Sequence, residues 1–203
     1  MMMKKNRIVS EVQSLKWLRE KAGECIWFGD DGGLISDPPR NKYGRTKREA
    51  ERVCRAQNDT SVLILRAPRF FCEDVLPTTT TQVKERMSLP QLMASELLGR
   101  RAALSDIITA HVKGLLLIEK LNGKVLTLAA PWPWSREETP GVAAEVAQLA
   151  RERFSDYRWP LPKTITRVYD STAARKELEW KPKWCFDRIV DEFDSDNVQL
   201  GLY

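Results

Sequence analysis

The sequence has few of the residues that metal centres require. It contains a single histidine, His111, and four cysteines, none of which forms a Cys-x-x-Cys pair. Structural zinc sites draw mainly on clustered cysteine and histidine side chains. We therefore expect no metal site, and we expect the cysteines to be free thiols in a reducing compartment. His111 falls in the middle of an expected helix, where a surface or packing role is more frequent than a catalytic one.

Long hydrophobic stretches are also missing. The longest mainly apolar run, residues 112–118, is much shorter than the roughly 20 apolar residues that a membrane-spanning helix needs. The basic residues near the N-terminus are not followed by the apolar segment of a secretory signal peptide. We expect a cytoplasmic protein that has no membrane partner.

No long segment of the sequence is dominated by charges of one sign. The chain carries 33 Lys and Arg against 28 Asp and Glu, for a formal net charge of +5. Basic and acidic residues are interleaved, as in 47–52, which is typical of a solvated helix face. Domains that bind nucleic acids instead gather basic residues on one face. We therefore expect no nucleic-acid partner and take a small molecule as the ligand.

The order of the expected elements favours an α/β fold. A helix over residues 43–56 precedes an apolar run at 61–65, and a helix over 107–121, capped by Ser105 and Asp106, precedes a second run at 124–128. Short apolar runs of this kind are typical of strands buried on both faces of a parallel sheet. Helix and strand in alternation predict parallel strands with helical crossovers. Further helices are expected at 89–98, 142–154, 171–178 and 186–193, and short strands at 7–9 and 165–168.

Tyr43 and Lys47 stand four residues apart at the start of the first helix. Residues at this spacing lie on one face of a helix. An ammonium group beside a phenol favours the phenolate, so that the phenol can exchange a proton near neutral pH. A tyrosine and a lysine at this spacing also occur on many exposed helices, so the pair alone leaves a catalytic role and a plain surface role open.

The residues around this pair resemble the extended short-chain dehydrogenases/reductases, the NAD-dependent epimerase/dehydratase family. Segment 41–51 is similar to the catalytic helix of that family, and 63–71 to the strand that follows it. Segment 103–111 resembles its strand-then-helix unit, which has an Asp at the helix start. Segments 167–171 and 178–182 are similar to its C-terminal signature, in which Glu179 here replaces the usual glycine. These similarities follow the family's order over residues 40–195.

The resemblance implies the C-terminal part of a Rossmann-like doubly wound parallel sheet with a small α+β substrate lobe. Residues 1–70 and 106–130 would form the partial Rossmann-like domain, and 71–105 and 131–203 the substrate-binding lobe. The implied cofactor is NAD or NADP, and the implied substrate is a carbonyl compound or secondary alcohol, sugars included. Tyr43 would act as the acid/base, and Lys47 as its partner and as a donor to the nicotinamide ribose.

Further roles follow from the same resemblance. It implies a cofactor contact for Ala67 and Pro68 and a substrate contact for Arg69, Phe70 and Arg101. A solvated position that complements a helix dipole is an equally good interpretation of Arg101. Trp132 and Trp134 would either wall a ligand or cover the core beside a proline-rich loop.

Two features of the family pattern are missing. The sequence has no Gly-x-x-Gly-x-x-Gly motif, whose glycines let backbone N–H groups approach the cofactor pyrophosphate. The glycine-rich but acidic stretch 29–33 is predicted to be a loop. The family's Ser or Thr before the tyrosine helix has no clean counterpart if residues 7–15 hold the preceding strand, because Ser10 and Ser14 only flank the expected position.

Two functional hypotheses therefore stay open. The chain is either an enzyme of the family or a truncated, catalytically inactive relative that serves as a binding or assembly module. Both hypotheses leave an incomplete sheet with an uncovered edge, and such an edge pairs readily with another chain. We expect a homo-oligomer or a partner chain there, unless residues 11–35 fold over the edge.

Overall fold

The computed structural model describes residues 23, 25–28, 42–71, 89–98, 101–154 and 161–194. The described helices are α2 (Lys42–Arg55), α4 (Leu89–Leu97), α5 (Leu104–Leu116), α6 (Ala143–Phe154), α7 (Thr172–Glu177) and α8 (Phe186–Asp194). The described strands are β1 (Ile26–Phe28), β2 (Ile64–Arg66), β3 (Phe70–Phe71), β4 (Ala102–Ala103), β5 (Val125–Thr127) and β6 (Arg167–Tyr169). The fold class is α/β, as the sequence predicts.

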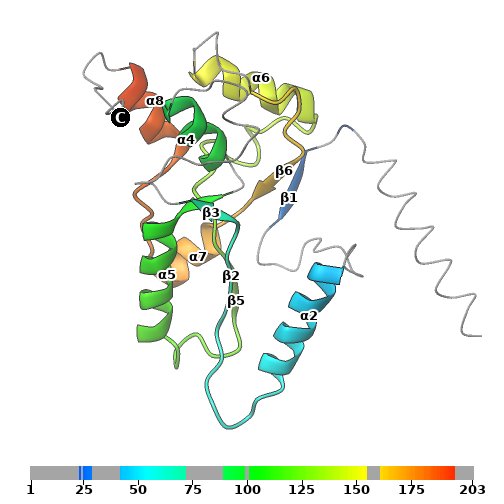
Figure 1. Cartoon of the computed structure of the whole chain (residues 1–203), viewed down its shortest axis with the longest axis vertical. Coiled ribbons are helices and arrows are strands. Elements are labelled where there is room, and N and C mark those ends of the chain that lie inside the picture. The colour runs from blue at the N-terminus through cyan, green and yellow to red at the C-terminus, as the bar shows by residue number, and fades with distance from the viewer. Residues whose placement is uncertain are drawn as a thin grey trace, which may run out of the picture.

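All strand pairs in the described part of the chain are parallel. β2 pairs with β5 so that Leu65 lies opposite Leu126, which confirms the expected pairing of the two apolar runs. Parallel strands need a long crossover connection, and the connection from β2 to β5 includes the helix α5 (Figure 1). β1 pairs with β6, and β3 pairs with β4.

The described strand that precedes α2 lies in a range for which the sequence predicted no strand. The expected strand at 7–9 lies outside the described residues, and so do the acidic stretch 29–33 and the flanking serines Ser10 and Ser14. The described strand before α2 is β1, which the sequence pattern did not predict because it is only three residues long. Its start is tied to the beginning of α6, because the backbone N–H of Cys25 donates to the carbonyl of Gly141 at 2.8 Å.

One hydrophobic core lies between β2, β5, α5 and α7. Its largest fully buried side chains are Trp180, Leu178, Leu121 and Leu128. Gly114 of α5 permits the close approach of this helix to β2, since a Cβ there would lie 3.0 Å from Leu63 Cδ2. Packing at this density means that extra volume on α5 would displace the strand beneath it.

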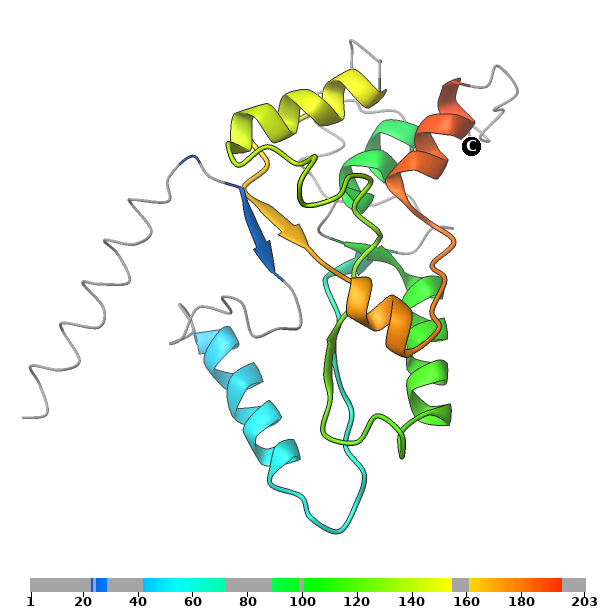
Figure 2. The same ribbon diagram turned by 180° about the vertical axis from the view of Figure 1, so that it is seen from behind.

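A second core lies among α4, α6 and α8, which Figure 2 shows grouped at the other end of the molecule. Phe154 of α6 and Phe186 of α8 are fully buried and stand 6.4 Å apart between ring centroids. Trp132, Trp134 and Trp184 pack against this core while remaining partly exposed. None of the described helices is both long enough and apolar enough to cross a membrane.

The start of α5 corrects one sequence expectation. The helix begins at Leu104 with Ala103 as its N-cap, so Ser105 and Asp106 lie inside the first turn and do not cap it. The carboxylate of Asp106 instead accepts hydrogen bonds from the backbone N–H groups of Lys183 at 2.8 Å and Trp184 at 2.9 Å. Asp106 is only 2% exposed, so this contact ties α5 to the segment before α8 inside the protein.

Helix α7 ends in a Schellman motif. The N–H of Trp180 donates to the carbonyl of Arg175 at 2.9 Å, and the N–H of Glu179 donates to that of Lys176 at 3.3 Å. This arrangement puts Glu179 in the left-handed conformation, at φ +50°. Glycine is the usual residue at such a position, which is the residue that Glu179 replaces in the family pattern.

Candidate active site

Tyr43 and Lys47 lie in the first turns of α2 and point to the same side of it. The Lys47 Nζ atom is 5.5 Å from the centroid of the Tyr43 ring, which confirms that the two side chains share a face. Tyr43 is 70% exposed and Lys47 is exposed as well, so both groups are accessible from solvent. The pair can hold an ammonium beside a phenol, but the roles assigned to the two residues remain predictions.

Helix α2 is joined to the parallel strands by an ion pair. The Arg66 guanidinium at the end of β2 donates to both carboxylate oxygens of Glu51 in α2, each at 2.9 Å. This paired geometry gives both strength and orientation, and the hydrogen bond from Arg66 lowers the pKa of the Glu51 carboxyl. The tyrosine–lysine pair therefore sits on a helix that is attached to β2 by a half-buried contact.

The turn after β2 holds the next four predicted site residues. Ala67 and Arg69 are exposed, Pro68 is half-buried, and the Ala67 N–H donates to the Leu65 carbonyl at 3.1 Å. Phe70 begins β3, opposite Ala102, and is 50% exposed. These side chains are available to a ligand, and their cofactor and substrate roles remain predictions.

Arg101 has a partner within the protein. Its guanidinium Nη1 pairs with Oε2 of Glu96, a carboxylate that is otherwise buried in α4. The positive charge of Arg101 is therefore engaged in balancing a buried negative charge, and a substrate contact would have to share it. Ser10 and Ser14, which flank the expected position of the family's Ser or Thr, lie outside the described residues.

His111 lies exposed on α5, with its Nδ1 atom 2.8 Å from the Ile107 carbonyl. This contact belongs to the helix itself, as expected for a surface histidine. Among the described residues, no group of three or more His, Cys, Asp and Glu side chains is placed to hold a metal ion.

The structure also brings together residues for which the sequence predicted no role as a group. The residues from 131 to 136, after β5, face the segment from the end of β6 to Pro182, and two adjoining clefts lie between them. Trp132 and Trp134 line one cleft with their rings 5.0 Å apart, and they also pack against the second core, as one of the two interpretations expects. A ligand contact for them remains a prediction. The detectable signal in the sequence was the cluster of Arg175, Lys176 and Lys181 around Trp180.

The sequence matches no protein-family model and no curated protein. Among solved structures, the chain is similar to UDP-glucuronic acid 4-epimerase from Bacillus cereus in complex with UDP-glucuronic acid and NAD, at 15% identity and a TM-score of 0.43. It is similar to dTDP-glucose 4,6-dehydratase from Bacillus anthracis in complex with NAD, at 17% identity and a TM-score of 0.42. It is also similar to ADP-L-glycero-D-manno-heptose-6-epimerase from Helicobacter pylori, at 14% identity and a TM-score of 0.40. The matches cover 81%, 84% and 79% of this chain and 56%, 55% and 52% of those chains. The chain thus spans about half the length of these structures.

Proposed function

We propose that this chain carries the tyrosine–lysine part of an NAD(P)-dependent oxidoreductase or epimerase site that acts on a carbonyl compound or secondary alcohol. The observation that carries the proposal is the approach of Lys47 Nζ to within 5.5 Å of the Tyr43 ring centroid. The pair lies on a helix whose sequence resembles the catalytic helix of extended short-chain dehydrogenases/reductases. Both side chains are open to a substrate.

The residues of this chain fit only one end of a dinucleotide cofactor. The Lys47 ammonium offers hydrogen-bond donors for ribose hydroxyls next to the Tyr43 phenol. The pyrophosphate end requires a glycine-rich turn at a helix N-terminus. The sequence has no such motif, and none of the described helices begins at a glycine-rich turn. A further segment or another chain would have to bind the pyrophosphate.

When bound, the nicotinamide would exchange a hydride with the substrate carbon that carries the hydroxyl or carbonyl oxygen. Tyr43 would take the hydroxyl proton of an alcohol as its C–O bond becomes C=O, and would return that proton in the reverse direction. The Lys47 ammonium would stay over the Tyr43 ring during this transfer. The ion pair between Arg66 and Glu51 would hold this helix against β2 during the transfer.

The activity test compares the wild-type chain with Tyr43→Phe and Lys47→Gln. The chain is mixed with NAD or NADP and a panel of secondary alcohols and sugar nucleotides, and reduced cofactor is followed by its absorbance. We expect Tyr43→Phe to lower turnover by ~100-fold or more, because proton transfer is lost. Arg45→Gln, an exposed residue of the same helix, is the matched charge control and should turn over like wild type. Equal rates for wild type and Tyr43→Phe would contradict the proposal.

Cofactor binding is tested separately by calorimetry with NAD, NADH and NADPH. We expect each to bind the isolated chain no tighter than about 1 mM, roughly 4 kcal/mol, because the nicotinamide end alone supplies the contacts. Micromolar binding would show that the chain does provide a phosphate site. Lys47→Gln should remove the weak binding, whereas Arg45→Gln should leave it unchanged.

A second function, as a binding or assembly module, is favoured by the surface of two helices. Throughout its described length, α2 buries no side chain, and Figures 1 and 2 both show it apart from the packed helices. Helix α5 exposes an apolar stripe formed by Ile108, Val112, Leu115 and Leu116, each at least 53% exposed. Exposed apolar surface of this kind favours association.

We propose that a second copy of the chain or a partner chain covers these helices. Sedimentation of the wild-type chain should show a dimer or larger species. The double variant Ile108→Lys with Leu115→Lys should shift it to a monomer with unchanged helix content. The matched control is the double variant Thr109→Lys with His111→Lys, which alters other exposed positions of α5. A wild-type chain that is monomeric at all accessible concentrations would contradict self-association and would leave only a partner chain to cover these helices.

A further inference from the structure

The two hydrophobic cores are separate groups of buried side chains. The first, around β2, β5, α5 and α7, contains Trp180, and the second, among α4, α6 and α8, contains Phe154 and Phe186. Strand β4 contributes to both, with Ala102 in the first core and Ala103 in the second. Alanine side chains bury little apolar area, so packing along β4 contributes little to holding the two cores together.

Residues 179–185, here called the strap, run from one core to the other. Trp180 is 1% exposed and belongs to the first core, whereas Trp184 packs against the second. Directly after the strap, α8 begins at Phe186, which is fully buried in the second core. A movement of α8 away from α5 would therefore displace the strap.

Asp106 of α5 holds the strap at both ends. Its carboxylate accepts the N–H of Lys183 at 2.8 Å with Oδ1 and the N–H of Trp184 at 2.9 Å with Oδ2. Its backbone carbonyl accepts the Nε1–H of Trp180 at 3.0 Å. Hydrogen bonds to an ionised carboxylate are stronger than those between neutral groups, and this carboxylate is shielded from water. Asp106 thus links the first core to the backbone that leads into the second.

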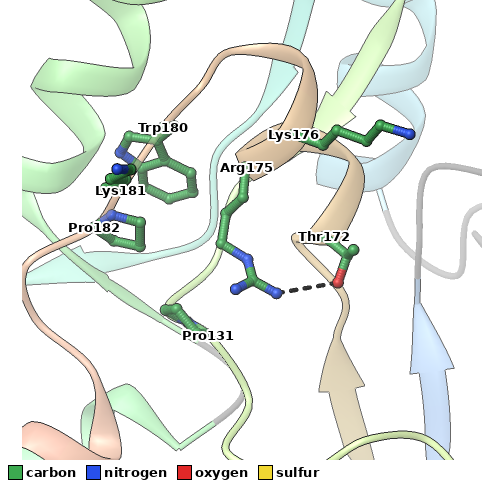
Figure 3. A pocket seen from close by; sticks show the side chains of 7 residues that line it. All are labelled: Pro131, Thr172, Arg175, Lys176, Trp180, Lys181 and Pro182. Carbon is green, nitrogen blue, oxygen red and sulfur yellow. Dashed lines mark hydrogen bonds between the residues drawn. The ribbon is translucent and has the colours of Figure 1, made fainter.

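Open space borders the strap on two sides. A cleft of about 420 Å³ lies between the strap and α5, where Thr109 and Lys113 of the helix line it together with Lys181 of the strap. A cleft of about 510 Å³ lies between the strap, α7 and the loop after β5. Figure 3 shows this second cleft, with its strap residues on one side and Arg175 and Thr172 of α7 on the other. On these two sides the strap has room to move.

We propose that the strap and Asp106 form a latch between the two cores. While the carboxylate holds the N–H groups of Lys183 and Trp184, the helices α4, α6 and α8 stay closed against α5. When it releases them, these three helices open as a unit, and the first core stays folded. Proteins commonly open in such cooperative units, each with its own free energy.

The latch would control access to the cleft of about 370 Å³ that the tryptophan pair lines. Trp132 and Trp134 pack against the second core, whereas Thr172 and Arg175, on the opposite wall, belong to α7 beside the first core. Opening of the latch would move these walls apart. This inference goes beyond the proposed oxidoreductase function, because the latch uses no residue of α2 or of the turn 67–70.

Native-state hydrogen exchange of the full chain, read by mass spectrometry of its peptides, tests the separate opening. In the wild-type chain, we expect the buried amides of α4, α6 and α8 to share one exchange rate. This rate should exceed that of β2 and β5 and depend less on denaturant, because the partial opening exposes less surface than complete unfolding does. This comparison needs no variant.

Two variants test the role of Asp106. Asp106→Asn should speed exchange in α4, α6 and α8 by about tenfold or more, because its hydrogen bonds to the strap are broken in the open state. Asp170→Ala is the matched control, since the Asp170 carboxylate also accepts a backbone N–H, that of Thr172 at 2.8 Å, but does so beside the first core. That bond persists when the latch opens, so the three helices should exchange as in wild type. Both variants favour complete unfolding and should speed exchange in β2 and β5.

Trypsin gives a second measurement at the latch itself. The peptide bond after Lys183 carries the Trp184 N–H that Asp106 holds, and its cleavage in the native chain follows the population of the open form. Asp106→Asn should speed this cut by about tenfold, whereas Asp170→Ala should leave it unchanged. The latch would be overturned by wild-type helices α4, α6 and α8 that exchange only as slowly as β2 and β5. Equal effects of the two variants on these helices would overturn it as well.

Discussion

In the packed body, residues 89–98, 101–154 and 161–194, buried polar side chains join one element to another, whereas on α2 every polar side chain except that of Glu51 is exposed. Asp106 in the body is 2% exposed and holds the backbone before α8. On α2, Tyr43 is 70% exposed, and Glu51 makes the link to β2. The buried polar groups of the body thus contribute to its stability, whereas the Tyr43 and Lys47 side chains of α2 are exposed to solvent.

This difference has a cause in the sequences of the helices. α6, which belongs to the body, buries Ala143, Val146, Ala147, Ala150 and Phe154, and these lie at helical spacing. α2 contains few large apolar side chains, and one of them, Val53, is 49% exposed. A helix that buries so little gains little from packing. Core packing therefore places few constraints on the side chains of α2.

The largest expected effect of a single substitution is in the body. Asp106→Ala would leave the N–H groups of Lys183 and Trp184 without their acceptor inside the protein. We expect the free energy of unfolding to fall by about 3 kcal/mol, measured by denaturant unfolding. Asp59→Ala, an exposed residue just after α2, should change it by less than about 0.5 kcal/mol. Equal effects of the two variants would remove the contrast between the regions.

Asp106 also shows where prediction from sequence ends. The sequence suggested that Asp106 caps α5, because an acidic residue at a helix start is a local signal. Its partners stand 77 and 78 residues away in the chain, so no local pattern could reveal them. Elements with strong local periodicity were predictable: α6 was expected at 142–154 and runs from Ala143 to Phe154.

The candidate site likewise has one feature that the sequence predicted and others that it did not. The shared face of Tyr43 and Lys47 follows from a spacing of four residues and was predicted. The ion pair between Arg66 and Glu51 joins a strand and a helix whose relative position the sequence did not specify. The cleft lined by both Trp132 and Arg175 depends on the packing of α7 near the loop after β5, which brings these two residues together.

The second-largest effect concerns the contact between α5 and β2. Gly114→Val would place side-chain atoms where Leu63 Cδ2 and Leu65 Cδ1 already lie, 3.0 Å and 3.3 Å from a Cβ at this position. We expect a loss of about 2 kcal/mol in the free energy of unfolding, since overpacking of a core is destabilising. Gly141→Val is the control, because no atom lies within 4 Å of a Cβ built there. Equal stability of both variants would mean that α5 is not held closely against the strand.

A smaller effect, with the opposite sign, is expected at the end of α7. Glu179 has φ +50°, a conformation that glycine adopts without steric cost. Glu179→Gly should therefore raise the free energy of unfolding by about 1 kcal/mol. Glu179→Ala removes the same charge but keeps a Cβ, so it should give no such gain. Stabilisation by alanine as large as that by glycine would point to charge rather than backbone conformation.

The last prediction compares the thiol of Cys25, beside the body, with the thiol of Cys54 on α2. Burial raises the pKa of the Cys25 thiol, beside the body, to about 11 from an ordinary value of 9.0. The folded chain therefore keeps this proton to higher pH than the unfolded chain does. The stability that depends on the neutral thiol is complete below about pH 9 and is lost as the pH rises towards 11. Cys185, whose pKa burial also raises, acts in the same direction.

Cys54 on α2 is exposed, so it should be alkylated by iodoacetamide well before Cys25 at about pH 8, because reaction requires an accessible thiolate. Peptide mapping by mass spectrometry identifies the modified residue at each time. In unfolding experiments between about pH 9 and 11, Cys25→Ala should flatten the fall in stability. Alkylation of both thiols at one rate in the native chain would show that Cys25 is as accessible as Cys54 on α2. The residues just before β1 would then not belong to the packed body.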